Sequence, residues 1–286
     1  MSTGRHRRHR PGDDRLLTAT RWTALAIVPF LVIAVAVLFA APDRSGELFA
    51  WPINPPMSAY LLASAYVGGI AYFVAVWRER RWHRVRHGLP AVLVFAGALL
   101  VITLLHFGRF SQNLPFAVWL TLYATTPIAM VALLVLQGGA DPRSPDPADV
   151  TIPRWARVAL AVIGLSALCA GVAALVAPAW VAELWAWQLT ELTARATGAV
   201  LTLTGVVNLA MLRDERWSAF RVLFGAQLLS LAAIAVSLVA RRDDLLWERP
   251  LTAPFLALVA AAAVAYGALA VWAERRLRTM RVAASG

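Results

Sequence analysis

The sequence predicts an all-α membrane protein with eight transmembrane helices, built as two parallel four-helix repeats. Of its 286 residues, 60% are hydrophobic and 15% are charged, whereas soluble domains average about 45–50% apolar and about 25% charged residues. The apolar residues come in continuous blocks, and about 20 such residues suffice to cross a bilayer. Tryptophans and charged turns also recur in register in the two halves of the chain.

Eight blocks qualify as spans, and their continuous rather than alternating hydrophobicity predicts helices instead of barrel strands. The first block follows basic residues, as in a signal peptide, but its apolar run is too long for one, so we expect an anchor. The fifth contains the single Cys169, which leaves no disulfide framework and no thiolate metal cluster. In chain order the expected spans are 22–41, 57–77, 89–107, 115–137, 155–179, 191–212, 219–240 and 251–273.

The charge distribution predicts the orientation of these spans. All 27 basic residues are arginine, and the net charge is +11. With eight spans, one side of the membrane carries 21 arginines and 9 acids, and the other carries 6 arginines and 7 acids. Cytoplasmic segments are enriched in basic residues, so we expect both termini on the cytoplasmic (inner) side of a plasma membrane. The arginine-rich side comprises 1–21, 78–88, 138–157, 213–221 and 274–286.

The same charges indicate partners. Arginines at the cytoplasmic face favour contacts with anionic lipids of the bilayer, and we do not expect the arm GRHRRHR (4–10) to bind nucleic acid. The segment 138–153 is rich in Pro, Asp and Gly, which predicts a flexible cytoplasmic linker. The expected organisation is a basic arm (1–21), a first repeat (22–137), the linker (138–153), a second repeat (154–273) and a basic tail (274–286).

The internal repeat rests on residues that unrelated membrane helices do not share in register. Three tryptophan pairs are separated by 133, 136 and 135 residues, namely Trp22/Trp155, Trp51/Trp187 and Trp82/Trp217. Each half has four spans, an even number, so the two halves enter the membrane the same way round. We therefore expect a pseudo-twofold axis along the membrane normal.

Two patterns resemble those of a protein family. W-x-W-x-L-T-x-L-T-A-R-x-x-G-A (185–199) and L-L-H-F-G-R-F (104–110) are similar to motifs of multi-spanning membrane proteins from high-GC bacteria, a family with no established activity. The resemblance covers spans two to eight, supports the topology and implies no chemistry. Relatives tend to have Pro in place of Glu191 and an acid in place of Gly108, which puts any family role of these positions in doubt here.

The sixth span carries a stripe of polar and small residues on one face. Thr190 is expected to cap this helix, and an acid in its first turn suits the helix dipole. The stripe has two interpretations: a groove that holds an anion or a polar headgroup, or a helix-packing face with a snorkelling arginine. The candidate ligand-binding residues are Glu191, Arg195, Thr202 and Asn208, and the candidate packing residues are Gly198 and Gly205.

A second candidate lies at the outer end of the third span, where His106 precedes Arg109. His106 has the chemistry to relay a proton, and a histidine bonded to a carbonyl is the alternative. With Arg195, Arg241 and Arg242 these residues would form an outer basic rim that attracts anions such as lipid phosphates.

No enzyme, metal site or cofactor is predicted. The chain lacks the nucleophile elbow, metalloprotease, phosphate-loop and dinucleotide motifs. His83 and His87 are spaced like two helical zinc ligands, but Arg84 and Arg86 beside them oppose a cation, so we expect a basic turn. The twelve tryptophans lie mostly at span ends, which is typical of an interfacial aromatic belt.

These patterns support two hypotheses of function. The first is a protein that binds or transports a small polar or amphipathic, lipid-like molecule between its two repeats. The alternative is a non-enzymatic accessory or scaffold protein that packs against a partner through small-residue faces such as 260–265.

Overall fold

The computed structural model describes residues 13–144, 146 and 149–285. Within this part, eight helices are long and apolar enough to cross a membrane, which confirms the multi-pass helical class. They are α1 (Thr18–Ala40), α3 (Pro56–Arg78), α4 (Gly88–Leu105), α5 (Leu114–Gln137), α6 (Arg154–Val176), α8 (Glu191–Ala210), α9 (Trp217–Ala240) and α10 (Thr252–Ser285). The last helix is longer than the predicted span, because most of the expected basic tail continues it.

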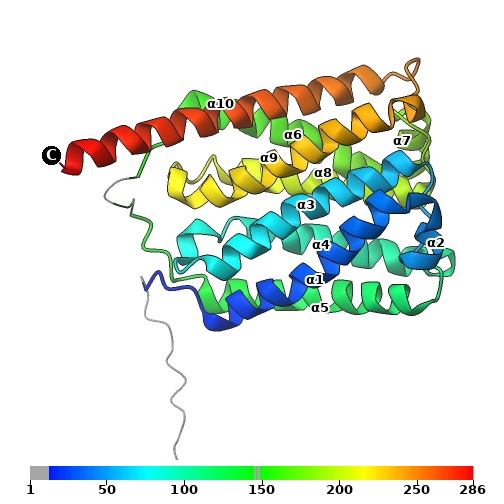
Figure 1. Cartoon of the computed structure of the whole chain (residues 1–286), viewed down its shortest axis with the longest axis horizontal. Helices are drawn as coiled ribbons and strands as arrows, with labels where there is room; N and C mark the ends of the chain where they lie inside the picture. The colour runs from blue at the N-terminus through cyan, green and yellow to red at the C-terminus, as the bar shows by residue number, and fades with distance from the viewer. Residues whose placement is uncertain (1–12, 145, 147–148, 286) are drawn as a thin grey trace, which may run out of the picture.

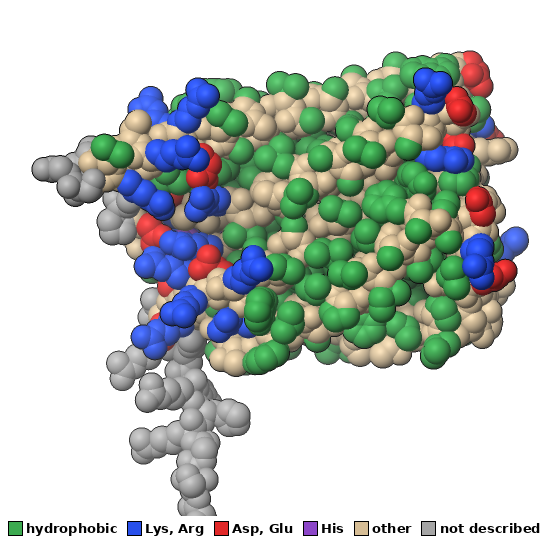
Figure 2. Space-filling model, viewed as in Figure 1, with side chains coloured by type: hydrophobic (Ala, Val, Ile, Leu, Met, Phe, Trp, Pro, Cys, Tyr) green, Lys and Arg blue, Asp and Glu red, His purple; other side chains and the backbone are tan. Residues whose placement is uncertain are grey.

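The helices run along one common direction (Figure 1). Helix α1 begins and α10 ends at the same end of the bundle, which we call the terminal end. The short helices α2 (Ser45–Leu48) and α7 (Pro178–Leu184) lie at the opposite end. Arginine side chains gather at the terminal end, whereas the side of the bundle in view carries mostly apolar side chains (Figure 2). This distribution is what a bilayer requires of a spanning protein, because its hydrocarbon excludes charge.

Local chemistry fixes where the helices begin. Thr190 caps α8 as predicted: its hydroxyl accepts from the backbone N–H of Thr193 at 3.2 Å, and the Thr193 hydroxyl accepts from the N–H of Thr190 at 2.8 Å. In the same way the Asn113 side chain accepts from the N–H of Phe116 at 2.9 Å and starts α5. Such caps satisfy backbone donors that have no partner within the helix.

Helix packing follows a crossed pattern. The most extensive pairs are α6 with α8, α1 with α3, and α3 with α9. Helix α4 contacts both α5 and α8, and α10 packs on α9. The second long helix of each half therefore packs against the third long helix of the other half, so the two halves form one bundle.

The seam between α6 and α8 is built from glycines. A Cβ atom at Gly171 would lie 2.7 Å from the carbonyl oxygen of Gly198, and one at Gly198 would lie 2.6 Å from that of Gly171. Gly205 similarly faces Gly164, whose carbonyl oxygen would lie 3.0 Å from the added atom. In lipid there is little hydrophobic drive between helices, so such backbone contact is a main source of affinity.

The aromatic-belt interpretation is only partly right. Trp22 and Trp155 are 61% and 75% exposed, as an interfacial belt requires. Six other tryptophans are buried because they pack inside the bundle; the Trp51 ring, for example, contacts those of Phe110 and Trp119. These six are Trp51, Trp82, Trp119, Trp185, Trp187 and Trp217.

Substitution in the glycine seam should destabilise the protein. Gly171→Ala places a methyl group against backbone that cannot move aside, and overpacking of this kind costs about 1–3 kcal/mol. Gly225→Ala in α9 is the matched control, because its added methyl meets nothing within 4 Å. Thermal unfolding in detergent should show a lower midpoint for Gly171→Ala and an unchanged or higher midpoint for Gly225→Ala. Equal midpoints would contradict the seam.

Candidate functional site

Of the predicted rim residues, Arg195 and His106 meet at the end opposite the terminal end, whereas Arg241 pairs with Asp244 and Arg242 lies near Asp243. Arg195 donates from Nε to the carbonyl of Leu175 at 3.1 Å and contacts the ring Nε2 of His106 with Nη1. Oε2 of Glu191 lies 3.9 Å from Nη1 of Arg195. Glu191 and Arg109 are both exposed. Burial, with the charge of Arg195 beside it, lowers the pKa of His106. Because a guanidinium can only donate, the ring nitrogen of His106 is the acceptor in this contact.

The deeper stripe residues are engaged inside the bundle. The Thr202 hydroxyl donates to the carbonyl of Ala199 in its own helix at 2.7 Å. Asn208 donates to the carbonyl of Leu160 at 2.8 Å and accepts from the Tyr266 hydroxyl. Gly198 and Gly205 face α6, as described above. The stripe thus contributes to helix packing, and none of its members lines the cavity described next.

A mostly apolar cavity of about 120 Å³ lies between the two halves. Its walls come from α1, α3, α4 and α5 of the first half and from α8 and α9 of the second. The lining residues include no Asp, Glu, Arg or His. Polar groups on the wall are few: Tyr66, Tyr72, Tyr123, Thr126, Gln227 and Ser230.

Two tyrosines on the wall of this cavity are hydrogen-bonded to each other. Tyr66 of α3 and Tyr123 of α5 are buried, and their oxygen atoms are 2.8 Å apart. One hydroxyl donates to the other, so one O–H hydrogen of the pair is not used between them. Tyr72, in contrast, donates to the carbonyl of Val85 at 2.8 Å. The pair can therefore donate one hydrogen bond to an acceptor in the cavity.

A groove between α1 and α5 adjoins the cavity. It has a volume of about 550 Å³ and is lined by apolar residues and by Thr23, Thr121, Thr125 and Thr126. Ile27, Leu122 and Thr126 line both the groove and the cavity. The two helices make few contacts with each other. Because the groove lies along two spanning helices, it faces lipid.

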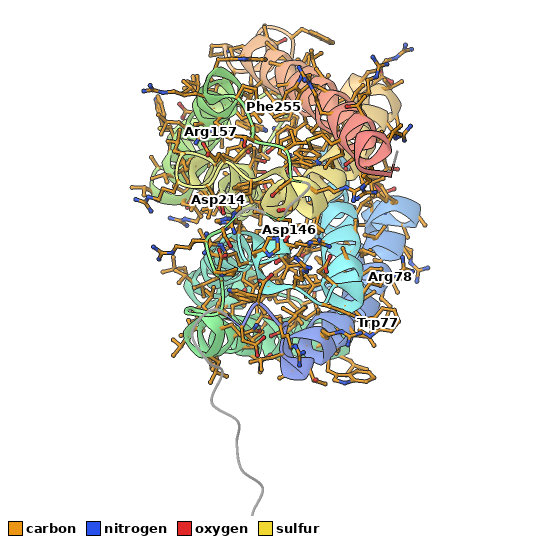
Figure 3. The ribbon with its side chains drawn as sticks, turned by 90° about the vertical axis from the view of Figure 1, so that its left-hand side faces the viewer. Trp77, Arg78, Asp146, Arg157, Asp214 and Phe255 are labelled. Atoms are coloured by element: carbon orange, nitrogen blue, oxygen red, sulfur yellow. The ribbon has the colours of Figure 1, made fainter. Side chains whose placement is uncertain are left out.

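The terminal end holds a buried ionic cluster, which we define as Arg86, His87, Asp141, Asp214 and Arg216. Arg216 donates to Asp141 and Asp214, with shortest distances of 2.7 Å to each. Arg86 lies 2.8 Å from Asp141 and 3.2 Å from Asp214. The cluster ties the linker to the turn between α8 and α9, near the middle of the terminal end (Figure 3).

Burial would favour the neutral form of Asp214, but hydrogen bonds from Arg216 and His87 outweigh it and hold the pKa of Asp214 well below its usual range. Burial also opposes the charged form of Asp141, but the hydrogen bond from Arg216 outweighs it and lowers the pKa of Asp141. Burial lowers the pKa of His87, whose Nε2 lies 2.9 Å from Asp214 and whose ring stacks on Phe220. The cluster is thus two arginines, two carboxylates and a neutral histidine.

The rest of the described linker is also anchored. Asp146 accepts from Arg81 and Arg84, and Asp149 accepts from the backbone N–H of Ser218 at 2.9 Å. Composition alone indicated flexibility; the carboxylates of the linker instead attach it to both halves.

His83 and His87 differ from the predicted solvated basic turn. His83 is buried, with Nδ1 at 2.5 Å from Asp14 and Nε2 at 3.2 Å from the Ser218 hydroxyl. His87 belongs to the ionic cluster. Neither ring is directed at a second histidine, because each is held by a partner far away in the sequence.

Sequence reasoning missed both the tyrosine pair and the ionic cluster. Tyr66 and Tyr123 sit in apolar spans, where single tyrosines are common. The cluster draws on three segments separated by more than 50 residues each. One sequence signal could have indicated the cluster: acids are concentrated in the linker and in the turn 213–217. Basic residues alone suffice to orient a membrane protein, so these acids call for another explanation.

Comparisons with protein-family models, with curated proteins and with solved structures found no match. The functional argument therefore rests on the chemistry of this chain alone.

Loss of one carboxylate from the ionic cluster should destabilise the fold. Asp214→Asn leaves Arg86 and Arg216 with Asp141 alone, and breaking a buried pair costs about 3–5 kcal/mol. Because the pKa of Asp214 is depressed on folding, its stabilisation is present above the unfolded value of about 3.9 and is lost as pH falls through the folded value. Thermal unfolding of Asp214→Asn should show a lower midpoint at neutral pH and a weaker dependence on acid.

The matched control is Asp243→Asn, because the Asp243 side chain is 95% exposed. Its midpoint should stay close to that of the unsubstituted protein. If the two variants unfold alike, the cluster does not stabilise the terminal end.

Proposed function

We propose that this integral membrane protein binds an uncharged, lipid-like molecule in the central cavity, and that this molecule enters from the bilayer through the groove between α1 and α5. The observation that carries the proposal is the buried Tyr66–Tyr123 pair on the wall of a cavity that shares Ile27, Leu122 and Thr126 with that groove. Lipid-like molecules are the most concentrated solutes that this opening meets.

The chemistry of the cavity selects the class of ligand. Its lining is mostly apolar, and a charged group would be costly to bury there without an opposite charge. The spare tyrosine hydrogen requires an acceptor oxygen, such as that of an alcohol, ether or carbonyl. Both tyrosines lie near the middle of their helices, so the acceptor would sit deep in the membrane rather than at headgroup depth. This ligand is less polar than the headgroup that the sequence suggested.

Orientation follows from charge. We infer that the terminal end faces the cytoplasm of a bacterial plasma membrane, because most arginines lie in the segments of that end.

We also infer that the two halves are repeats related by a pseudo-twofold axis. In support, each tryptophan pair of the expected register has matching burial: exposed for Trp22/Trp155 and buried for Trp51/Trp187 and Trp82/Trp217. Backbone contacts match as well: Ser111 donates to the carbonyl of Ala50 at 2.9 Å, and Leu246 donates to that of Ala186 at 2.8 Å. Side chains follow the same register: Tyr60 donates to the carbonyl of Phe39 at 3.2 Å, as Arg195 does to that of Leu175.

We favour binding or transport over catalysis, because the cavity lining offers hydroxyl and amide groups without a histidine, acid or thiol to activate them. The resemblance to the high-GC bacterial family remains a hypothesis that implies no activity.

The scaffold alternative has one supporting observation. Gly198 and Gly205 are covered by α6, but α10 exposes small residues including Ala257, Ala261 and Ala268. Small residues allow close helix contact. A stoichiometric protein partner that co-purifies in mild detergent and is lost in an Ala261→Leu variant would favour this alternative over a lipid-binding role.

Photolabelling tests the proposed function. A long-chain alcohol with a diazirine group in its chain should label peptides of α1 and α5 in the purified protein. Ala26→Trp, which fills the groove, should reduce labelling several-fold. Ala235→Trp on the exposed face of α9 is the matched control and should not. Labelling spread evenly over all helices, or unaffected by Ala26→Trp, would contradict the proposal.

A second comparison isolates the tyrosine pair. Tyr66→Phe with Tyr123→Phe should reduce labelling by the alcohol and leave labelling by a diazirine-bearing alkane unchanged, because only the alcohol has an acceptor. Equal effects on both probes would show that the hydroxyls do not bind the ligand.

A further inference from the structure

A second pocket lies at the terminal end, far along the helices from the tyrosine pair. It has a volume of about 510 Å³ and lies between the linker, the start of α6 and the turn between α8 and α9. Its lining contains five arginines but only two acids, together with Thr151 and Leu212. The arginines are Arg86, Arg143, Arg157, Arg213 and Arg216, and the acids are Asp214 and Glu215.

The arginines of this pocket are not equally engaged. Arg86 and Arg216 form the floor, where the carboxylates of the ionic cluster already neutralise them. Arg143 and Arg213 are exposed at the mouth, and no carboxylate among the described residues lies within ion-pair distance of either. The pocket therefore has excess positive charge at its mouth.

Arg157 lines the same pocket from the start of α6. Its Nη2 donates to Glu215 at 3.1 Å, but its Nε is buried and has no hydrogen-bond partner among the described residues. The Arg157 side chain is 17% exposed, whereas that of Glu215 is 55% exposed. A buried guanidinium donor without an acceptor is costly, and an anion in the pocket can supply that acceptor.

The position of the pocket indicates where this anion comes from. Exposed Trp155 lies two residues before Arg157 at the start of α6, and exposed tryptophans of spanning helices mark the level of lipid headgroups. Several guanidinium groups around one cavity match the oxygens of a phosphate, which they bind through paired, charge-assisted hydrogen bonds.

We propose that this pocket binds a phosphate group, carried by an anionic phospholipid or free in solution. Arg143, Arg157 and Arg213 hold the phosphate oxygens, and the exposed Thr151 hydroxyl is available as a further donor. Glu215 competes with the phosphate for Arg157. This site is independent of the tyrosine pair, because no residue lines both the pocket and the central cavity.

Native mass spectrometry of the full-length protein tests this site with two probes, dioctanoyl phosphatidylglycerol and inorganic phosphate. Arg143→Gln combined with Arg213→Gln should weaken binding roughly tenfold or more, because a hydrogen bond to a charged group contributes about 1.5–3 kcal/mol. The matched control, Arg276→Gln with Arg278→Gln, removes the same charge from exposed positions of α10 and should change binding less than about twofold. Glu215→Gln should tighten binding by freeing Arg157.

Saturable binding of phosphatidylglycerol that follows this pattern assigns the site to a phospholipid. The same pattern with inorganic phosphate alone assigns it to a soluble phosphate, and both results support the proposal. If the two double variants lose binding equally, net charge alone explains the loss, and the proposed phosphate site is overturned. No tightening in Glu215→Gln, or no saturable binding of either probe, would also overturn it. Labelling of the α1–α5 groove is unaffected by any of these results, so the two proposals fail separately.

Discussion

Backbone contact between α6 and α8 is the constraint on which much of the bundle depends. Helices in lipid gain little from burying apolar side chains, since the surrounding acyl chains are equally apolar. Gly171 and Gly198 remove that limitation by letting two backbones touch. The seam fixes α8, and α8 in turn supports α4 of the other half. In the first half α1 packs extensively on α3 but makes few contacts with α5. The groove lies between α1 and α5, and it is open to lipid there.

The eight spans were predictable because hydrocarbon imposes a simple rule: a block must be predominantly apolar and long enough to cross. The cap at Thr190 was predictable for a similar reason, since helix ends have fixed local chemistry. The end of α10 was not, because a basic amphipathic tail and a helical continuation have the same composition. The tryptophans at span ends were misassigned in part because position along a helix does not reveal whether a ring points to lipid or to a neighbouring helix.

The candidate sites show the same division. Arg195 and His106 were both assigned to the outer rim, but their direct contact depends on the packing of α8 on α4, which no local pattern reveals. Thr202 and Asn208 looked like a groove lining because their helical spacing is right, but a packed helix face has the same spacing. The ionic cluster was hidden because Arg216 finds Asp141 across 75 positions of sequence. Long-range partners of this kind require the fold to be known.

The crossed packing of the halves has a consequence for how the chain holds together. Helix α3 rests on α9 and α8 rests on α4, while Asp141 and Asp149 fasten the linker to the turn before α9 and to its first turn. Covalent continuity between residues 144 and 149 thus adds little to an association already made by helices. A polypeptide ending before this point and another starting after it contain complementary surfaces, so we expect them to assemble as a two-fragment protein in the same membrane. In such fragment complementation, the two halves would associate as the subunits of a dimer do.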